Sequence, residues 1–355
     1  MALVYFKCSD FRCLESAELE FSGGNNLIFG ANASGKTSIL EAIGYLGRAR
    51  SFRGAGIREL VRHNAEEFVL FGKVQSGSRL VTLGIRNSQG GLEVHTDGEK
   101  SQSAAPLAEA LPLQVIDPEV HELVGGGPEG RRRYVDWMAF HVEHGYLASW
   151  RRFRRALKQR NAALKGCFDR QALQGWDREL AELGTAVDSA RRRMLEIVAP
   201  VLRELGEKLL GSAVDIEYRR GWAADATLAD ALADSVERDR LLQSTQSGPH
   251  RADLRLNYDE RQARKLVSRG QQKLLACALI LAATEVVQSG LEKPLLLLLD
   301  DPAAELDSEA VSRLMAVVQN AGCQVIATTL DPGQPLFAEP PAMFHVEHGT
   351  VKRVS

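Results

Sequence analysis

A glycine-rich stretch, placed between an apolar run and a helical pattern, has the composition of a phosphate-binding loop. Its residues are Gly30, Ala31, Asn32, Ala33, Ser34, Gly35, Lys36 and Thr37, with the spacing G-x-x-x-x-G-K-T. The backbone N–H groups of such a loop form an anion nest, and the start of the following helix adds partial positive charge. Lys36 can reach the β and γ phosphates, and Thr37 can hold Mg²⁺ through its hydroxyl. A plain turn before a helix is the alternative, but the strand–loop–helix context favours a nucleoside triphosphate site.

Two adjacent carboxylates, Asp300 and Asp301, follow the leucine run 295–299 and can complete this site. A buried strand with this composition delivers its last residues to the carboxyl edge of a parallel sheet, beside the phosphate loop. Asp300 would then hold Mg²⁺ together with Thr37. Asp301 would orient the attacking water or accept its proton. The alternative for either residue is an acidic cap on the next helix.

A second anion-binding pattern precedes the strongly apolar helical run 274–287. Ser268, Arg269, Gly270, Gln271 and Gln272 offer a hydroxyl, backbone amides and a helix dipole to a phosphate. Because the phosphate loop already covers one side of the triphosphate, this second pattern suggests a site that another subunit closes. Asp307, in the sequence Glu-Leu-Asp, would lie at that junction.

Hydrophobic patterning predicts the elements that must position these residues. Strands are expected at 3–6, 14–21 and 26–29, the second at a sheet edge, and a helix at 35–46. Three short alternating runs, 68–74, 80–85 and 92–95, predict an antiparallel meander. Further expected elements are a strand at 113–116, a strand at 254–258, a helix at 308–319 and a strand at 324–328.

Between these regions the composition becomes helical. Apolar residues at helical spacing over 146–164 and 176–202 predict two paired helices joined by a loop at 166–175. Residues 131–165 hold ten lysines and arginines but only two acidic residues. A solvated helix face is one interpretation, but such faces usually mix both signs, so we prefer a phosphate-binding patch. The candidate DNA contacts are Arg131, Arg132, Arg151, Arg152, Arg155 and Lys158.

A second basic segment carries Arg48, Arg50, Arg53, Arg58 and Arg62. Its pattern is equally typical of a solvated loop and of a DNA-facing loop.

Composition narrows the class of protein. The 355 residues are 45% apolar and 25% charged, as in globular proteins of two or three domains, and the formal charge of −2 gives no overall attraction to nucleic acid. The five scattered cysteines form no C-x-x-C pair, which argues against a zinc or disulfide framework and for a reducing compartment. No signal sequence is recognisable and the longest apolar run, 295–299, is too short to cross a bilayer, so we expect a cytoplasmic protein with no membrane partner.

These motifs together resemble the ABC-type ATPase heads of SMC-like repair proteins, and in more detail the bacterial RecF family. The specific matches are at 9–12, 127–136, 248–251 and 268–273, in order over nearly the whole chain. The resemblance implies an α/β fold with an ABC-type P-loop ATPase head and an antiparallel β subdomain. It assigns residues 1–117 and 241–355 to the head and residues 118–240 to an inserted helical arm lobe.

The resemblance also implies ATP and Mg²⁺ as cofactors and an ATP-dependent, head-to-tail homodimer. By position, Lys36 and Thr37 act within their own subunit, Asp300 on Mg²⁺ and Asp301 as the catalytic acidic residue. Ser268, with Gly270 and Gln271, contacts the γ-phosphate bound by the other subunit, and Arg12 flanks the phosphates or the base. Members of the family bind DNA at single-strand/double-strand junctions of gaps, and act with RecR and RecO to load RecA.

Two departures from the ABC pattern affect the expected activity. Asp301 stands where ABC proteins usually carry Glu, and its shorter side chain holds water less well, so we expect slow ATP hydrolysis. We expect DNA to stimulate this weak ATPase activity. Thr329 stands where the switch histidine is usual, which leaves γ-phosphate sensing at that position in doubt.

Three other functions fit these features less well. A chromosome-organising SMC-like ATPase would need a far longer coiled coil than 118–240 can provide. The nucleotide-binding subunit of a membrane transporter would keep a Gln loop and a His switch. A P-loop kinase would not need the Ser268 pattern.

The hexapeptide Phe-His-Val-Glu-His-Gly occurs twice, at 140–145 and 344–349, and holds four of the eight histidines. Metal binding is one hypothesis, but two histidines on an irregular segment are a weak signal. The other is that the repeat is selected in the DNA, because one choice of codons gives a nearly palindromic sequence.

Overall fold

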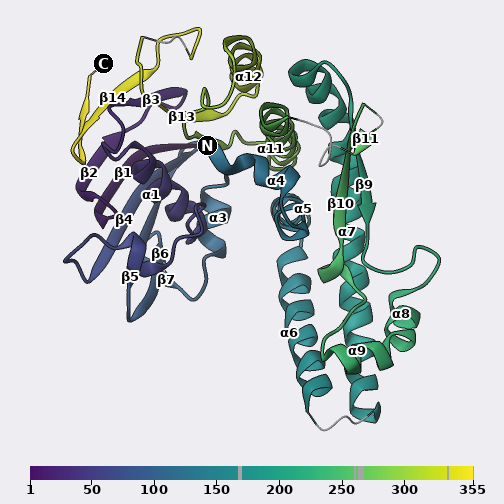
Figure 1. The fold of residues 1–355 in the computed structure, drawn as a ribbon. Coiled ribbons are helices and arrows are strands. Elements are labelled where there is room, and N and C mark those ends of the chain that lie inside the picture. The colour runs from purple at the N-terminus through teal and green to yellow at the C-terminus, as the bar shows by residue number, and fades with distance from the viewer. Residues whose placement is uncertain (167–169, 260, 263–267, 334–335, 355) are drawn as a thin grey trace. The chain divides into compact units, whose positions relative to one another are not determined.

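The computed structural model describes residues 1–166, 170–259, 261–262, 268–333 and 336–354. The chain divides into two compact units, which are described separately. Unit 1 comprises Met1–Val120 and Glu292–Ser355, and unit 2 comprises His121–Leu291. Figure 1 shows that unit 1 carries most of the strands and that unit 2 is mainly helical.

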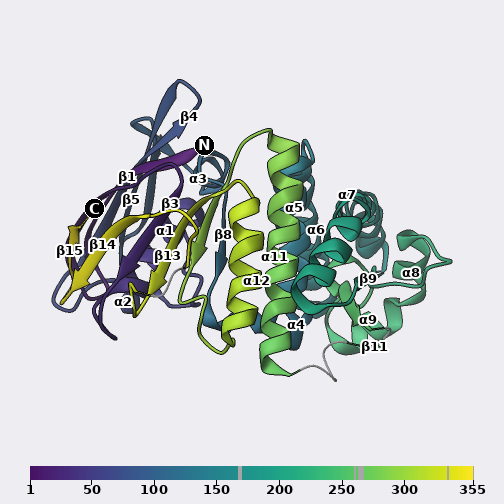
Figure 2. The same ribbon diagram turned by 90° about the horizontal axis from the view of Figure 1, so that it is seen from above.

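Unit 1 contains a mostly parallel sheet in the strand order β15-β14-β3-β13-β12-β8. β12 (Leu296–Leu299) is buried between its neighbours β13 and β8, which explains its uninterrupted leucines. β3 (Asn25–Phe29) pairs with the other side of β13, so β3 and β12 end at the same edge of the sheet. Figure 2 shows β15, β14, β3 and β13 side by side. The other strands are β8 (Leu113–Ile116), β13 (Gln324–Thr329), β14 (Ala342–Glu347) and the antiparallel β15 (Thr350–Arg353).

The second sheet of unit 1 is antiparallel, in the order β2-β1-β4-β5-β6-β7. Buried and more exposed residues alternate along β4 (Glu67–Ser76), because only one face of this sheet is covered. That face packs on α1 (Lys36–Arg48) in an apolar core to which the parallel sheet also contributes. The remaining elements are β1 (Ala2–Phe11), β2 (Leu14–Glu20), α2 (Ile57–Leu60), β5 (Arg79–Ser88), β6 (Gly91–Thr96), β7 (Glu99–Ser101), α3 (Ala105–Ala110), η1 (Pro118–His121) and α12 (Ser308–Asn320).

Unit 2 is built on two long helices that lie side by side, α6 (Tyr146–Lys165) and α7 (Arg170–Leu210) (Figure 1). Most of the apolar residues that recur every three or four positions are buried, as the spacing predicted, whereas Trp150, Leu157 and Trp176 are partly exposed. A three-stranded antiparallel sheet packs beside α7, in the order β11-β10-β9. The remaining elements are α4 (Glu122–Gly125), α5 (Pro128–Val142), β9 (Val214–Arg219), α8 (Leu228–Asp234), α9 (Val236–Leu242), η2 (Pro249–Arg251), β10 (Asp253–Tyr258), β11 (Arg261–Gln262) and α11 (Arg269–Leu291).

One helix, α11, is long and apolar enough to cross a membrane by length and composition alone. Most of its apolar window, 72%, is buried, and the helix packs against α4, α5 and α7. These contacts are those of a core helix, which needs no polar face because neighbours surround it.

The division between the units differs from the expected one in its second boundary. Residues 241–291, expected in the head, belong to unit 2 because β10 pairs with β9 and α11 packs on α5 and α7. The antiparallel meander and the strand at 113–116 are present as expected, whereas β9, β14 and β15 were not expected. The predicted loop 166–175 is shorter, since α7 begins at Arg170, and its residues 167–169 lie outside the described part.

Candidate functional site

The phosphate loop connects β3 to α1, with Gly35 capping the helix at a φ of 114°. Position 30 also requires a glycine, because an added Cβ would lie 2.2 Å from the carbonyl oxygen of Val346. Lys36 Nζ donates to the carbonyl oxygens of Gly30 and Ala31, at 2.7 and 2.9 Å, so its ammonium lies over the loop. The Ser34 hydroxyl is buried and has no hydrogen-bond partner among the described residues. This loop therefore has the donors that a phosphate chain requires.

A short hydrogen-bond chain links the helix that follows this loop to the end of β12. The Thr37 hydroxyl donates to Asp300 Oδ1 at 3.0 Å, which brings together the two residues expected to hold Mg²⁺. The Thr328 hydroxyl donates to the same oxygen at 2.8 Å and accepts from the Asp301 N–H at 2.9 Å. Thr328 is fully buried and was missed by the sequence analysis, which considered only its neighbour Thr329. The Thr329 hydroxyl instead donates to the Asp331 carbonyl at 3.3 Å.

These residues face a cavity of about 460 Å³ within unit 1. It is large enough for a nucleotide, at the scale typical of small-molecule sites. Asp301, with a φ of 48°, also reaches it. The lining residues are Cys13, Asn32, Ala33, Ser34, Gly35, Lys36, Thr37, Ser38, Arg53, Pro118, Asp300, Asp301, Thr328 and Leu330.

Burial opposes both charges at the centre of this cavity. Burial raises the pKa of Asp300, and the hydroxyls of Thr328 and Thr37 partly offset that rise. Burial lowers the pKa of Lys36, while Asp301 and Asp300 act in the opposite direction. A bound phosphate and a bound cation would each supply the missing counter-charge, so the donor and acceptor set fits a metal–nucleotide complex.

Arg12, expected beside the phosphates or the base, has a different set of partners. Its Nε and one terminal nitrogen donate to the fully buried carboxylate of Glu41 on α1, both at 2.9 Å. Ser51 donates to the same carboxylate at 2.6 Å, and its hydroxyl accepts from the N–H groups of Arg53 and Ala55. The guanidinium of Arg12 thus neutralises a buried acid, and Arg53, at the end of this chain of contacts, is the arginine that lines the cavity.

Ser268 and Asp307 both cap helices. The Ser268 hydroxyl accepts from the Gln271 N–H, and the Gln271 side chain accepts from the Ser268 N–H, which is a capping box at the start of α11. Ser268 and Gln271 are exposed, and they belong to unit 2 whereas the phosphate loop belongs to unit 1. Asp307 accepts from the Ala310 N–H at the start of α12. Their expected places at a subunit junction stay predictions.

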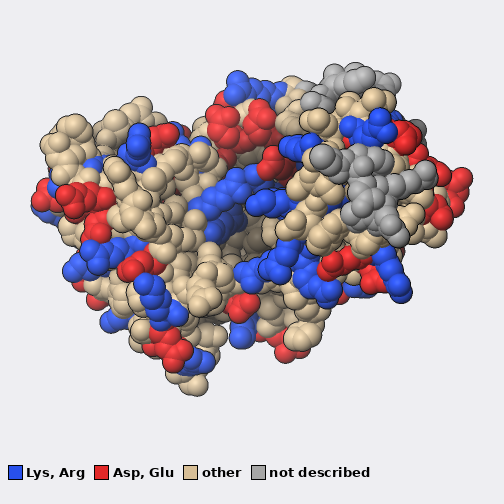
Figure 3. All heavy atoms as spheres, turned by 90° about the horizontal axis from the view of Figure 1, so that it is seen from below, with Lys and Arg blue, Asp and Glu red and all other residues tan. Residues whose placement is uncertain are grey.

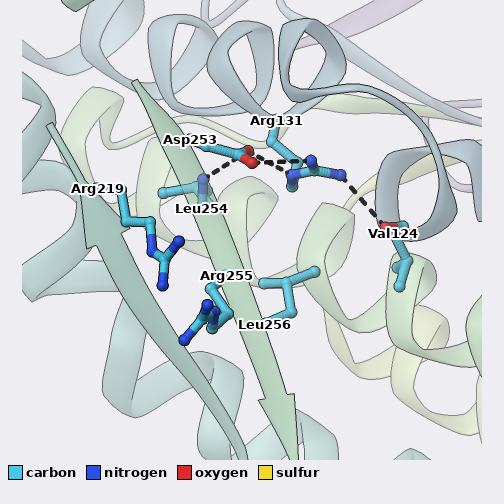
Figure 4. A pocket seen from close by; sticks show the side chains of 7 residues that line it. All are labelled: Val124, Arg131, Arg219, Asp253, Leu254, Arg255 and Leu256. Carbon is cyan, nitrogen blue, oxygen red and sulfur yellow. Dashed lines mark hydrogen bonds and ion pairs between the residues drawn. The ribbon is translucent and has the colours of Figure 1, made fainter. Parts of the chain in front are cut away.

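Arg131 is a structural residue, which corrects its inclusion among the DNA contacts. Its side chain is only 4% exposed and forms a two-pronged ion pair with Asp253, at 2.7 and 3.2 Å. Its third nitrogen donates to carbonyl groups that include that of Val124 (Figure 4). Arg132 is half-buried and donates to the Ala252 carbonyl. The guanidinium of Arg131 is buried and its nitrogens already donate to protein groups, so Arg131 does not reach a DNA phosphate.

The other candidate DNA contacts lie on α6 and are exposed. Arg151, Arg155 and Lys158 are spaced by four and three residues, so they share one face of the helix. Arg152 is 63% exposed and lies 3.4 Å from Glu179. These exposed basic residues of α6 are called the α6 stripe. Figure 3 shows basic and acidic side chains near one another on much of the visible surface, which is therefore not uniformly basic.

The basic segment at 48–62 is divided between three roles. Arg48 donates to the Leu113 carbonyl and to Gln114, and Arg62 pairs with Asp10 at 2.7 Å. Arg53 faces the nucleotide-sized cavity, and Arg50 and Arg58 are exposed. Two of the five arginines are therefore used in internal contacts.

A parallel sheet with a phosphate loop after one strand and paired carboxylates after another, joined to an antiparallel sheet, is the head fold of the ABC-type ATPases. The family model described as the RecF/RecN/SMC N terminal domain matches residues 2–352. DNA replication and repair protein RecF of Pseudomonas paraeruginosa is 39% identical over 100% of this chain and 98% of its own length. RecF of Pseudomonas fluorescens is 40% identical over 92% of this chain and 91% of its own. The chain therefore belongs to the bacterial RecF family of DNA replication and repair proteins.

Solved structures support the same placement. The recombination mediator protein RecF-ATP of the RecFOR pathway superposes with a TM-score of 0.90 at 27% identity, covering 100% of this chain and 98% of that one. The SmcHead bound to the C-winged helix domain of ScpA superposes with a TM-score of 0.61 at 17% identity, covering 100% and 97%. The second likeness concerns the fold alone.

Proposed function

We propose that this chain binds and slowly hydrolyses ATP as a DNA-binding protein of recombinational repair. The observation that carries the proposal is the cavity in which Lys36, Thr37 and Asp300 meet, with Thr37 and Asp300 joined at 3.0 Å. The solved relative named RecF-ATP supports ATP as the nucleotide. We further propose that the protein works in the cytoplasm.

In this proposal five residues of the cavity have assigned tasks. Lys36 and the loop N–H groups bind the β and γ phosphates. The Ser34 hydroxyl, which has no hydrogen-bond partner among the described residues, is one more donor. Thr37 and Asp300 hold Mg²⁺, which supplies charge neutralisation to the phosphates when bound. Asp301 orients the attacking water and accepts its proton. Its short side chain positions water less well than a glutamate would, so hydrolysis is slow and DNA stimulates it.

The active form is a head-to-tail homodimer. Ser268, exposed at the start of α11, contacts the γ-phosphate held by Lys36 of the second copy, with Gly270 and Gln271 beside it. Two ATP molecules thereby hold the dimer on DNA at the single-strand/double-strand junction of a gap, and their hydrolysis releases it. RecR and RecO act with this dimer to promote RecA loading.

The test is DNA binding by the full chain with no nucleotide, ADP, ATP or a non-hydrolysable ATP analogue, on gapped and on blunt duplexes. We expect tight binding to the gapped duplex only with ATP or the analogue. Asp301→Asn, which keeps the phosphate loop, should bind DNA with ATP as durably as the parent does with the analogue. Equal binding without nucleotide would reject the proposal.

A further inference from the structure

The repeated hexapeptide adopts two different secondary structures. The first copy, at 140–145, forms the last turn of α5 and the connection to α6. The second copy, at 344–349, forms most of β14 and the turn into β15. A shared local structure therefore does not explain why the same six residues occur twice.

The two copies also have different side-chain surroundings. In the first, His141 lies edge-on to Trp137 and Phe140, and Glu143 forms a two-pronged ion pair with Arg193. In the second, Phe344 is 1% exposed against Phe21, and His345 stacks on Phe29. Glu347, the counterpart of Glu143, is exposed.

Two features of the second copy contribute to the phosphate loop, and both are backbone features. The Val346 carbonyl lies against Gly30, and the Gly349 N–H donates to the Ser34 carbonyl at 2.9 Å. Only the glycines behave alike in the two copies, since Gly145 and Gly349 have φ values of 79° and 77°. Backbone contacts and a left-handed glycine do not require Phe-His-Val-Glu-His before it.

A metal site does not explain the histidines either. Among the described residues, which include all four repeated histidines, no group of three or more His, Cys, Asp and Glu side chains could hold a metal ion. The two copies lie in different compact units. The protein thus offers no common role for the repeated side chains.

The genetic code offers a different explanation for the repeat. The codon TTC for Phe is the reverse complement of GAA for Glu, and CAC for His is the reverse complement of GTG for Val. The run Phe-His-Val-Glu can therefore be written as TTC-CAC-GTG-GAA, which is a perfect palindrome, and no other choice of codons for these residues is. The next His begins with CA, whose complement TG ends the single codon of Met343, so the symmetry around the second copy extends further.

We propose that the two gene segments encoding Phe140–His144 and Phe344–His348 are binding sites for a dimeric DNA-binding protein, and that the peptide repeat is their translation. A two-fold symmetric dimer reads a palindromic site, because each subunit contacts one half of it. The two segments meet this constraint in different structures: one ends a helix, and the other is a strand whose Phe344 and Val346 lie in the apolar core.

Sequencing of the gene gives the first test. Both copies should use TTC-CAC-GTG-GAA, with at most one substitution, and codons for the same residues elsewhere in the gene serve as the control. A departure from TTC-CAC-GTG-GAA at two or more bases in either copy would overturn the proposal.

Dimethyl sulfate footprinting in living cells gives the second test. We expect a two-fold symmetric pattern of protected bases at both segments. In a strain with synonymous codons at both places, which makes an identical protein, the pattern should disappear. Protection without symmetry, or the absence of protection in the parent strain, would contradict the proposal. At the protein level, His144→Gln and His348→Asn should leave unfolding and DNA binding unchanged, and a loss of either would place the role of the repeat in the protein.

Discussion

At the scale of single residues, Thr328 shows what the cavity adds to its motifs. Its hydroxyl joins Asp300 to the backbone of Asp301, so one small side chain fixes the Asp300 carboxylate and the main chain of the next residue. Neither a motif nor a periodicity marks it, because it is the fifth residue of a strand that is buried throughout and is followed by a second threonine.

Thr328→Val removes that hydroxyl and keeps the shape of the side chain. We expect the free energy of unfolding to fall by about 1–3 kcal/mol, because buried polar groups lose their partner. The pKa of Asp300, already raised by burial, should rise further, since the lost hydrogen bond lowered it. When the pH is lowered, the variant should therefore lose Mg²⁺-dependent ATP binding at a higher pH than the parent does.

The matched control for this variant is Thr284→Val. Thr284 is fully buried in α11 and donates only to its own helix, to the Ile280 carbonyl. This variant should leave the pH profile of ATP binding unchanged. A similar profile for both variants would mean that Thr328 only fills space.

Asp117 provides a pH-dependent prediction. Burial, and after it the charge of Asp300, raise the pKa of Asp117 from 3.8 to about 6. The folded chain then holds this proton more tightly than the unfolded chain, so its contribution to stability falls as the pH rises from about 4 to about 6. Asp117→Asn, which cannot ionise, should raise the free energy of unfolding at pH 7 by about 1–3 kcal/mol.

Urea unfolding of Asp117→Asn and the parent at pH 4.5 and pH 7 measures this effect. The gain should be small at the lower pH and full at the higher. Asp97→Asn is the opposite control, because a hydrogen bond from the Thr82 N–H lowers the pKa of Asp97, and its loss should not stabilise the protein at pH 7. An equal gain at both pH values would rule out the ionisation of Asp117 as the cause.

At the scale of elements, Glu41 joins three segments of unit 1. It lies on α1, accepts from Arg12 in the β1–β2 turn, and accepts from Ser51 at the start of the segment that carries Arg53. The same segment also contacts the end of β1, where Asp10 forms an ion pair with Arg62. The phosphate-loop helix and the cavity arginine are thus held by one buried carboxylate.

Arg12→Ala should lower the free energy of unfolding by about 2–4 kcal/mol, because it leaves a buried carboxylate without its charged partner. Arg62→Ala is the control: its pair with Asp10, in which both side chains are about one-third exposed, should be worth about 1 kcal/mol or less. Unfolding in urea separates the two. If Arg12→Ala weakened ATP binding without loss of stability, the original expectation that Arg12 touches the nucleotide would be the better one.

The exposed stripe on α6 gives a second prediction at this scale. Reversal of Arg151, Arg152 and Arg155 to Glu should weaken DNA binding and lower the slope of log K against log salt by about 2–3, because each phosphate contact contributes about 0.9. The control reverses Arg79, Arg203 and Arg313, which are exposed arginines on other elements. If both triple variants changed the slope equally, overall charge and not the stripe would be responsible.

At the scale of the whole molecule, the two anion-binding patterns belong to different compact units. The phosphate loop is in unit 1 and the Ser268 capping box is in unit 2. Ser268 is exposed although its hydroxyl already caps α11. A helix start with this composition can bind phosphate from a second copy, as proposed for the dimer.

Ser268→Arg tests that dimer. The variant should bind ATP as the parent does but remain a monomer in sedimentation with ATP and Mg²⁺, because the longer side chain blocks the approach of the second copy. Thr227→Arg is the control, since Thr227 is also an exposed N-cap of unit 2 and would lose its hydrogen bond to Asp230. A normal ATP-dependent dimer of the Ser268 variant would reject the composite site.

The sequence by itself determined the candidate phosphate-binding residues and the strands that carry them. Lys36, Thr37 and Asp300 could be predicted because local patterns mark them. A glycine-rich turn after β3 marks Lys36 and Thr37, and the uninterrupted apolar run of the buried strand β12 marks Asp300. The antiparallel meander could be predicted as well, because a sheet covered on one face alternates buried and exposed residues along each strand.

Only the tertiary structure decided which polar residues meet across the chain. Arg131 and Arg12 look like cations available to a ligand, but distant acids, Asp253 and Glu41, bind them. The repeated hexapeptide became a helix end in one place and a strand in the other, because neighbouring elements override the weak preference of six residues. The sequence thus predicted a phosphate site, and long-range contacts decided which basic side chains are paired within the fold.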